Sequence, residues 1–198
     1  MSLYEFEKQK TAEGCGLICG VDEAGRGPLA GPVFAAAVVL PLDYEIEGIN
    51  DSKKLSEKKR EQLFDEIIEH AVAYSIKSCD HRVIDEINIL QATMLAMKTA
   101  VETLSVRPDM VFVDGNRLPK LDIPANYVIK GDATSANIAA ASILAKVSRD
   151  RLMREMDKRY PEYEFAKHKG YPTKLHYEKI REFGPSEIHR LTFLRKMH

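Results

Sequence analysis

The chain has 198 residues, of which 44% are hydrophobic and 30% are charged, a composition typical of an ordinary globular protein. This length suits one domain, or one domain with a small appendage. Three cysteines without a Cys-x-x-Cys pair argue against a disulfide framework or a zinc knuckle, so we expect reduced thiols and a cytoplasmic protein. No apolar run approaches the roughly 20 residues that span a membrane, and the N-terminus lacks the apolar core of a signal peptide.

The net charge of −1 does not indicate a polyanionic partner, but the charge is unevenly distributed along the chain. Residues 144–198 contain fourteen Lys and Arg against eight Asp and Glu, a net charge of +6, whereas residues 1–143 carry −7. Such an asymmetry often marks a half that binds nucleic acid. A solvated helix face gives the same pattern, so charge alone leaves both interpretations open.

Hydrophobic periodicity predicts alternating strands and helices along most of the chain. Short apolar or alternating runs predict strands over residues 16–22, 33–40, 71–78, 110–113 and 127–130. Spacings of three and four residues predict helices over residues 57–70, 81–87, 89–107, 136–149, 151–159 and 174–183. Ser56 and Asn88 are expected N-caps, and Val72, Tyr74 and Ile76 are expected on one face of their strand. Residues 1–14 are polar and predict a loosely attached lead-in.

The stretch Gly20–Val33 contains residue types that suit chemistry on a phosphate-bearing substrate. Asp22 and Glu23 follow a buried strand, and two carboxylates at a strand end suit a divalent metal. The glycines of the Gly25-Arg26-Gly27 turn permit positive φ and a close approach of the backbone to a phosphate-bearing ligand. The alternative is a surface turn with solvated acids, and two distant aspartates argue against it.

Asp114 and Asp132 also follow predicted strands, and strand ends meet at one edge of an α/β sheet. We therefore expect Asp22, Glu23, Asp114 and Asp132 to form one cluster. Clustered carboxylates repel each other unless a cation neutralises them, and oxygen ligands favour Mg²⁺ or Mn²⁺ over zinc. Two such ions about 4 Å apart serve in-line phosphoryl transfer, and we expect Asp22 to bridge them.

Two of these assignments carry a condition. Consecutive strand residues point to opposite faces, so Glu23 reaches the cluster only if the chain bends after Asp22. Asp132 precedes a helix, so a role as helix cap is the alternative to metal binding for this residue.

The sequence Asp-Glu-Ala-Gly-Arg-Gly-Pro-Leu-Ala-Gly-Pro-Val, which begins at Asp22, resembles the signature of bacterial ribonuclease HII, and further matches extend to Ile188-His189-Arg190. The resemblance implies a metal-dependent endonuclease that cleaves the RNA strand of RNA–DNA hybrids and single ribonucleotides in duplex DNA. It implies cleavage on the 5′ side of the ribonucleotide, which leaves a 3′-hydroxyl and a 5′-phosphate, within ribonucleotide excision repair. It also implies that the four acids are metal ligands.

The resemblance further implies an α/β, ribonuclease H-like fold, with a mixed central sheet flanked by helices and a C-terminal helical segment. We expect one catalytic domain over residues 1–198, with an α/β core over about 16–150 and a helical substrate-binding segment over about 151–198. The nucleic acid is the expected partner, and we expect a monomer that does not bind membranes.

Substrate contacts follow from the same resemblance. The Gly25-Arg26-Gly27 loop is expected to read the 2′-hydroxyl, which distinguishes RNA from DNA, through its backbone. Tyr171 matches the tyrosine that stacks on the sugar at the junction in this family, although an aromatic that only pins its loop is the alternative. Independently of the resemblance, the expected phosphate contacts are Lys53, Lys54, Lys146, Arg149 and Lys169, although the sequence does not distinguish any one of them from a solvated lysine or arginine.

Two other functions stay open on the sequence. One is another nuclease of the same fold, such as a junction-resolving enzyme or a ribonuclease H of the sister type, and the Gly-Arg-Gly loop argues against it. The other is a binding module for hybrids that has lost catalysis, which only a cleavage assay with and without Mg²⁺ separates from an enzyme.

Overall fold

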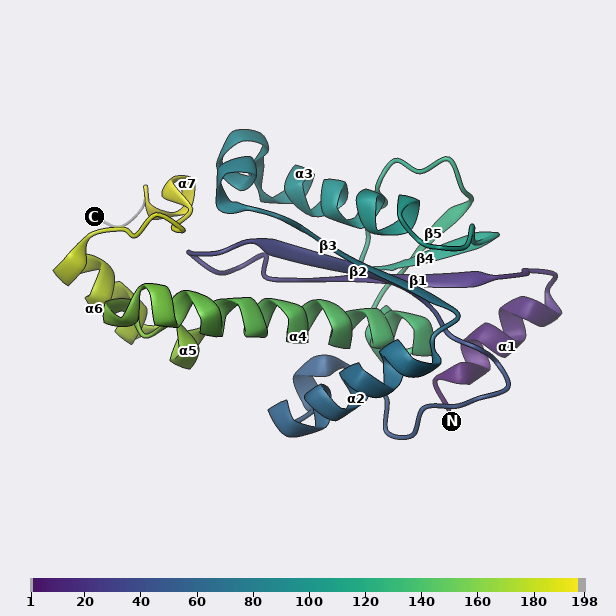
Figure 1. Ribbon diagram of the computed structural model, residues 1–198. Helices are drawn as coiled ribbons and strands as arrows, with labels where there is room; N and C mark the ends of the chain where they lie inside the picture. The colour runs from purple at the N-terminus through teal and green to yellow at the C-terminus, as the bar shows by residue number, and fades with distance from the viewer. Residues whose placement is uncertain (1, 196–198) are drawn as a thin grey trace.

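The computed structural model describes residues 2–195, and its centre is a five-stranded mixed sheet between two layers of helices (Figure 1). The strands lie in the order β3-β2-β1-β4-β5, with bounds β1 Ile18–Ala24, β2 Val33–Val39, β3 Ala73–Cys79, β4 Met110–Asp114 and β5 Ala125–Val128. Strand β2 runs antiparallel to both of its neighbours, β1 and β3, whereas β4 lies parallel to both β1 and β5.

Helices cover both faces of this sheet (Figure 1). Helix α3 (His81–Glu102) packs on one face, and α4 (Ala136–Arg159) packs on the other, with α2 (Glu57–His70) and α1 (Tyr4–Ala12) against α4. The short helices lie beyond the β1–β2 turn or in connections; they are α5 Phe165–His168, α6 Lys174–Phe183, α7 Leu191–Leu194 and the 3-10 turns η1 Ser52–Lys54, η2 Gly131–Ala133 and η3 Pro161–Tyr163. The predicted α/β fold with a mixed sheet flanked by helices and a C-terminal helical part is confirmed.

Small side chains bring α4 close to the sheet. Ala139, Ala140 and Ala141 of α4 lie in the same apolar cluster as Ala36 and Val38 of β2. A second cluster fills the space between α3 and the opposite face of the sheet. Because β1 and β2 have apolar neighbours on both faces, they read in the sequence as nearly continuous apolar runs.

Both predicted N-caps are confirmed. The Ser56 hydroxyl accepts a hydrogen bond of 3.2 Å from the Lys59 N–H at the start of α2. Asn88 has φ 68° and interrupts α3, and its side-chain oxygen accepts hydrogen bonds from the N–H groups of Leu90 and Gln91. The short segment over 81–87 and the long helix after it are therefore two halves of one kinked element.

The strand predicted over 71–78 is present as β3, and the face that carries Tyr74 and Ile76 is its more open one. Val72 is 47% exposed and Tyr74 is also exposed, whereas Ala73 and Ser75 are buried against α3. Strand β3 is the edge of the sheet, and the neighbouring helix leaves room only for small side chains on the covered face. The larger apolar residues consequently mark the more open face.

Residues 4–12 form a docked helix, which corrects the expectation of a loosely attached lead-in over this part of 1–14; residue 1 lies outside the described residues. Helix α1 docks through Tyr4 and Glu7, each 1% exposed. The Glu7 carboxylate accepts hydrogen bonds from the Ser135 hydroxyl and from the N–H groups of Ala136 and Asn137. An anion there stabilises the N-terminus of α4, where unpaired N–H groups and the helix dipole favour negative charge.

Among residues 2–195, no helix is both long enough and apolar enough to cross a lipid bilayer.

Candidate active site

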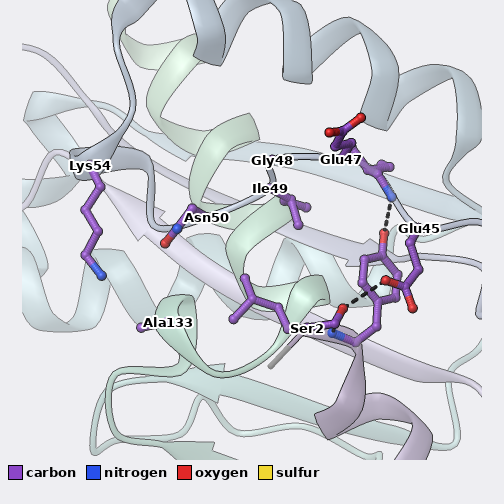
Figure 2. Close-up of a pocket in the computed structure, with 11 residues that line it drawn as sticks. Ser2, Glu45, Glu47, Gly48, Ile49, Asn50, Lys54 and Ala133 are labelled. Carbon is purple, nitrogen blue, oxygen red and sulfur yellow. Dashed lines mark hydrogen bonds between the residues drawn. The ribbon is translucent and has the colours of Figure 1, made fainter.

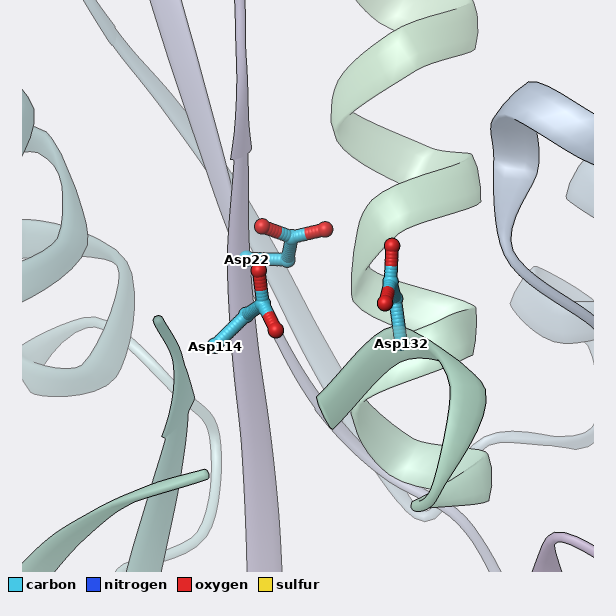
Figure 3. Close-up of side chains that lie close together, drawn as sticks. All are labelled: Asp22, Asp114 and Asp132. Carbon is cyan, nitrogen blue, oxygen red and sulfur yellow. The ribbon is translucent and has the colours of Figure 1, made fainter. Parts of the chain in front are cut away.

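Three aspartates converge at the edge of the central strands (Figure 3). Asp22 belongs to β1, Asp114 is the last residue of β4, and Asp132 lies on η2. One carboxylate oxygen from each residue lies within 4.8 Å of the other two. Strands β1 and β4 are parallel neighbours, with Val21 opposite Val113, so the two residues that follow this pair point to a common place.

Asp132 reaches this cluster because Asp114 holds its turn. The Asp114 carboxylate accepts a hydrogen bond of 2.6 Å from the Gly131 N–H. The N-cap of α4 is Ser135, whose hydroxyl accepts from the Ile138 N–H at 3.2 Å. Asp132 is therefore not the cap of α4, and the alternative that the sequence left open for it is excluded.

Burial and mutual repulsion disfavour the charged form of these carboxyls. The pKa of Asp22 is raised well above its usual value, first by burial and then by the charges of Glu23 and Asp114. The pKa of Asp132 is raised by burial and by the charge of Asp114. The nearest cation is the Lys53 ammonium, 3.8 Å from Asp132 and largely exposed. A buried, oxygen-only cluster short of positive charge fits a hard divalent cation such as Mg²⁺ or Mn²⁺.

Glu23 is not among the residues whose carboxylate oxygens lie within 4.8 Å of one another, although its charge acts on Asp22. Strand β1 remains paired with β2 through Ala24, which lies opposite Phe34, so the bend expected after Asp22 is absent. The Glu23 carboxylate lies 3.3 Å from the Arg26 guanidinium. Burial raises the pKa of Glu23, and Arg26 opposes that shift. In this structure Glu23 and Arg26 neutralise each other beside the cluster.

The two glycines of the Gly25-Arg26-Gly27 turn differ in what the fold requires. Gly25 has φ +99°, and a Cβ there would lie 2.2 Å from Nε of Arg149. A Cβ on Gly27 would meet only the Tyr171 ring, at 4.0 Å. The fold therefore demands glycine at position 25, whereas the space beside Gly27 is open to a ligand.

Tyr171 lies beside this turn although it comes from the C-terminal part of the chain. Its side chain is 37% exposed, and the Arg149 guanidinium lies 5.5 Å from the centre of its ring. The loop that carries it is tied to the turn region, because the Leu29 N–H donates to the Gly170 carbonyl at 2.8 Å. The structure thus brings the predicted turn and the predicted tyrosine to one surface.

Three of the expected phosphate contacts are engaged within the protein. Arg149 is 0% exposed and donates only to backbone carbonyls, so its expected phosphate contact is wrong. The Lys146 ammonium donates to both oxygens of Asp150, at 2.6 and 2.7 Å, and the Lys169 ammonium donates to the Ala166 carbonyl. Lys146 and Lys169 reach a phosphate only by leaving these partners. The Lys53 side chain is exposed.

A set of buried polar residues under the turn was not identified from the sequence. Arg190, in a tail without periodicity, donates to the carbonyls of Gly25, Arg26 and Gly31. His168, His176 and His189 are also buried and lie in contact with one another. The only sequence signal for them was the Ile188-His189-Arg190 match, to which no role was attached.

A pocket of about 620 Å³ lies between the start of α1 and η2 (Figure 2). Glu45, Glu47, Asn50 and Lys54 line it, together with Ala133, the residue that follows Asp132 in the chain. Glu45 also accepts from the Ser2 hydroxyl at 2.9 Å.

A mixed sheet of this kind, with a carboxylate cluster at its central strands, defines a nuclease of the ribonuclease H class. Ribonuclease H2 from Pyrococcus horikoshii OT3 matches with a TM-score of 0.74 and 29% identity, over 89% of this chain and 93% of that one. Bst-RNase HIII, solved in complex with Mn²⁺, shares the fold with a TM-score of 0.71 at 17% identity, over 92% of this chain and 69% of that one.

The sequence comparisons identify the family within this class. The family model "Ribonuclease HII" matches residues 19–196, and the chain belongs to this family. Ribonuclease HII of Caldicellulosiruptor bescii is 57% identical over 194 residues, which cover 98% of this chain and 94% of that protein. The protein is therefore an endoribonuclease, a hydrolase of the ribonuclease H type that acts on RNA–DNA substrates.

Proposed function

We propose that this enzyme, with divalent metal ions, cleaves both the RNA strand of RNA–DNA hybrids and single ribonucleotides embedded in duplex DNA. It cuts on the 5′ side of the ribonucleotide and leaves a 3′-hydroxyl and a 5′-phosphate. The observation that supports this most directly is the convergence of three buried aspartates from β1, β4 and η2, within 4.8 Å of one another. They lie at the sheet edge from which β1 continues into the Gly25-Arg26-Gly27 turn.

Asp22, Glu23, Asp114 and Asp132 would hold Mg²⁺ or Mn²⁺. When bound, these ions activate the attacking water and neutralise the charge that develops on the leaving oxygen. Asp22 is the residue that would bridge two ions, because its position is fixed by pairing with Ala36 of β2 and by the preceding residue, Val21, which lies opposite Val113 of β4. Glu23 joins the set by exchanging its contact with Arg26 for the metal site.

Substrate recognition uses the open surface beside Gly27 and Tyr171. The turn reads the 2′-hydroxyl through backbone groups, and the ring of Tyr171 stacks on the deoxyribose that follows the ribonucleotide. Arg26, Lys53 and Lys54 bind phosphates directly, and Lys146 and Lys169 contribute after leaving their partners.

At the level of the whole chain, we propose one catalytic domain over residues 1–198, comprising a core over about 16–150 and a substrate-binding segment over about 151–198. Helix α4 runs unbroken across the boundary between them, so the segment is rigidly joined to the core. The net charge of +6 over 144–198 supports a role in holding the duplex. We further propose that the enzyme acts as a cytoplasmic monomer in the removal of ribonucleotides from DNA.

The test is a cleavage assay on three end-labelled duplexes: one with a single ribonucleotide, a uniform RNA–DNA hybrid, and an all-DNA duplex of the same sequence. With Mg²⁺ or Mn²⁺ we expect cuts in the first two only, with a product that carries a 3′-hydroxyl. Binding of the hybrid without cleavage in either metal would show a non-catalytic module. Equal cutting of the all-DNA duplex or of a four-way junction would show a different nuclease of this fold.

A further inference from the structure

The inner surface of the Gly25–Pro32 segment rests on two buried arginines. Arg190 donates to the carbonyls of Gly25 at 2.6 Å, Arg26 at 2.9 Å and Gly31 at 2.8 Å. Arg149 donates to the carbonyls of Ala30 at 3.1 Å, Pro32 at 3.1 Å and Lys169 at 2.9 Å. Both arginines are 0% exposed. Five carbonyls of one eight-residue segment thus face inward onto two guanidinium groups.

This arrangement determines the direction of the N–H groups in the turn. A trans peptide unit is planar, and its N–H points opposite to its C=O. Because the carbonyls of Gly25 and Arg26 point at Arg190, the N–H groups of Arg26 and Gly27 point away from it. Neither N–H donates to an acceptor within residues 2–195. The outer face of the turn therefore presents two unused donors beside the open space at Gly27.

The fold keeps a charged group where an apolar one would pack at lower cost. Neither Arg149 nor Arg190 forms an ion pair with a carboxylate among residues 2–195. Burial, and then the charge of Arg149, lowers the pKa of Arg190 to about 9, so its guanidinium is still protonated at neutral pH. A buried cation without a counter-ion is unfavourable, and only a planar guanidinium offers donors in a fixed fork to three carbonyls.

The tail that carries Arg190 also connects the turn with the loop of Tyr171. The Arg190 N–H donates to the Leu29 carbonyl at 2.8 Å, and Ala30 forms a bridge with His189. His189 accepts at Nδ1 from the Ser186 N–H, so its Nε2–H donates to Nε2 of His176 at 3.0 Å. The Nδ1–H of His176 then donates to the Tyr171 carbonyl at 3.0 Å. The C-terminal tail therefore links the Gly25–Pro32 segment to the loop that carries Tyr171 through hydrogen bonds, and fixes the position of one relative to the other.

We propose that Arg190 is a positioning residue for sugar discrimination: by binding the carbonyls of Gly25 and Arg26, it turns the N–H groups of Arg26 and Gly27 toward the 2′-hydroxyl of the substrate. The proposal rests on the proposed function, in which this turn reads the 2′-hydroxyl. Arg190 is buried and touches no substrate itself.

The experiment compares Arg190→Met and Arg190→Lys with the control Arg154→Met. Arg154 lies on α4, where it pairs with Glu57 and Glu61 away from the turn, so the control removes the same charge. For each variant we would measure KM and kcat on the duplex with one ribonucleotide, Ki of the all-DNA duplex as inhibitor, and Mn²⁺ affinity by calorimetry.

We define the preference for the ribonucleotide as Ki of the all-DNA duplex divided by KM of the duplex with one ribonucleotide. We expect this ratio to fall about tenfold in both Arg190 variants, because each loses roughly one net hydrogen bond to the substrate. Ki and Mn²⁺ affinity should stay at the wild-type values, because phosphate contacts and carboxylates are untouched. Arg154→Met should leave the preference unchanged even where its melting temperature falls. A purely structural role would lower kcat or the melting temperature and leave the preference intact.

A folded Arg190→Met enzyme with the wild-type preference would overturn the proposal and leave the proposed function standing. If Arg190→Met does not fold, Arg190→Lys is the variant that tests the proposal, because lysine keeps the positive charge but lacks the planar guanidinium donors. An unchanged preference for the ribonucleotide in Arg190→Lys would also overturn the proposal. Failure of the proposed function shows itself in the wild type, as no cleavage of either ribonucleotide-containing duplex.

Discussion

Gly25 and Gly27 are two residues apart, but the fold requires glycine only at position 25. We expect Gly27→Ala to keep the wild-type melting temperature within about 2 °C, since its Cβ enters open space. Its kcat/KM on a duplex with one ribonucleotide should fall tenfold or more, roughly the effect of 1.4 kcal/mol, because the methyl group occupies the place of the sugar.

Gly25→Ala is the matched comparison, and we expect it to lose roughly 1–3 kcal/mol of unfolding free energy through its positive φ and its clash with Arg149. Urea unfolding and steady-state cleavage measure both effects. Normal turnover by Gly27→Ala would show that the turn does not approach the sugar.

The carboxylate cluster yields a second prediction at the same scale. Asp22→Asn and Asp114→Asn should abolish cleavage in Mg²⁺ while binding to the hybrid persists, because each substitution removes metal-binding charge at constant volume. Asp132→Asn should also lose activity, partly restored by added Mn²⁺. Ser135→Ala should do the reverse, with about 1 kcal/mol less stability and normal turnover, because Ser135 is the cap of α4.

Cleavage rates and denaturant midpoints of these four variants separate a loss of metal-dependent activity from a loss of stability. Substantial turnover by Asp22→Asn or Asp114→Asn in Mg²⁺ would refute the proposed metal ligands. An Asp132→Asn protein with full activity would remove Asp132 from the site.

At the scale of elements, the hydrogen bonds between α1 and the N-terminus of α4 all come from one carboxylate, that of Glu7. Glu7→Ala leaves the Ser135 hydroxyl and the N–H groups of Ala136 and Asn137 without their acceptor. We expect a loss of roughly 1–3 kcal/mol in the free energy of unfolding, the cost of unsatisfied buried donors. Glu5→Ala, on the exposed side of the same helix, should change it by less than about 0.5 kcal/mol. Equal effects of the two substitutions would mean that α1 is not docked.

The elements after α4 should be sensitive to acid. Burial, followed by the charges of neighbouring histidines, lowers the pKa of His176 and of His189 to about 4, against 6.5 for an ordinary histidine. The unfolded chain therefore takes up protons below pH 6.5 while the folded chain does not. Stability should be lost as pH falls from about 6.5 to 4, by at most roughly 3 kcal/mol for each histidine.

The variant that tests this is His176→Gln, whose amide can still donate and accept but does not titrate. Its melting temperature should depend less on pH between 6.5 and 4 than that of the wild type. Identical profiles for wild type and His176→Gln would contradict a buried neutral histidine set.

At the scale of the whole molecule, the recognition surface is assembled from parts that are distant in sequence. Tyr171 approaches Gly27 only because α4 and the C-terminal tail return to the β1–β2 turn (Figure 1). Tyr171→Ala should cost about tenfold to a hundredfold in rate at an isolated ribonucleotide, from roughly 1–3 kcal/mol of stacking. Tyr171→Phe should stay near wild type, because the ring supplies the stack.

Both Tyr171 variants should be compared on the single-ribonucleotide duplex and on a uniform hybrid, where we expect a smaller loss. Equal small losses for Ala and Phe on both substrates would leave Tyr171 as a loop-packing residue and remove the proposed sensing of the junction.

Local sequence was sufficient for much of the architecture and for the origin of the aspartate cluster. Apolar periodicity predicted the helices over 57–70 and 174–183 with the bounds that the structure shows, because their apolar faces pack on a core that lies to one side. Asp22 and Asp114 could be expected to meet because they directly follow the apolar parts of two strands, whose carboxyl ends adjoin in a parallel pair.

Only the tertiary structure decided which polar groups are buried and which partners they have. Arg149 and Arg190 resemble solvated cations in sequence, and Glu7 resembles part of a polar lead-in. The position of each side chain is determined by hydrogen-bond partners that lie far away along the chain: carbonyls of the Gly25–Pro32 segment for the two arginines, and the N-terminus of α4 for Glu7. Periodicity records the burial of apolar side chains, whereas the burial of a polar one depends on distant hydrogen-bond partners that local sequence does not reveal.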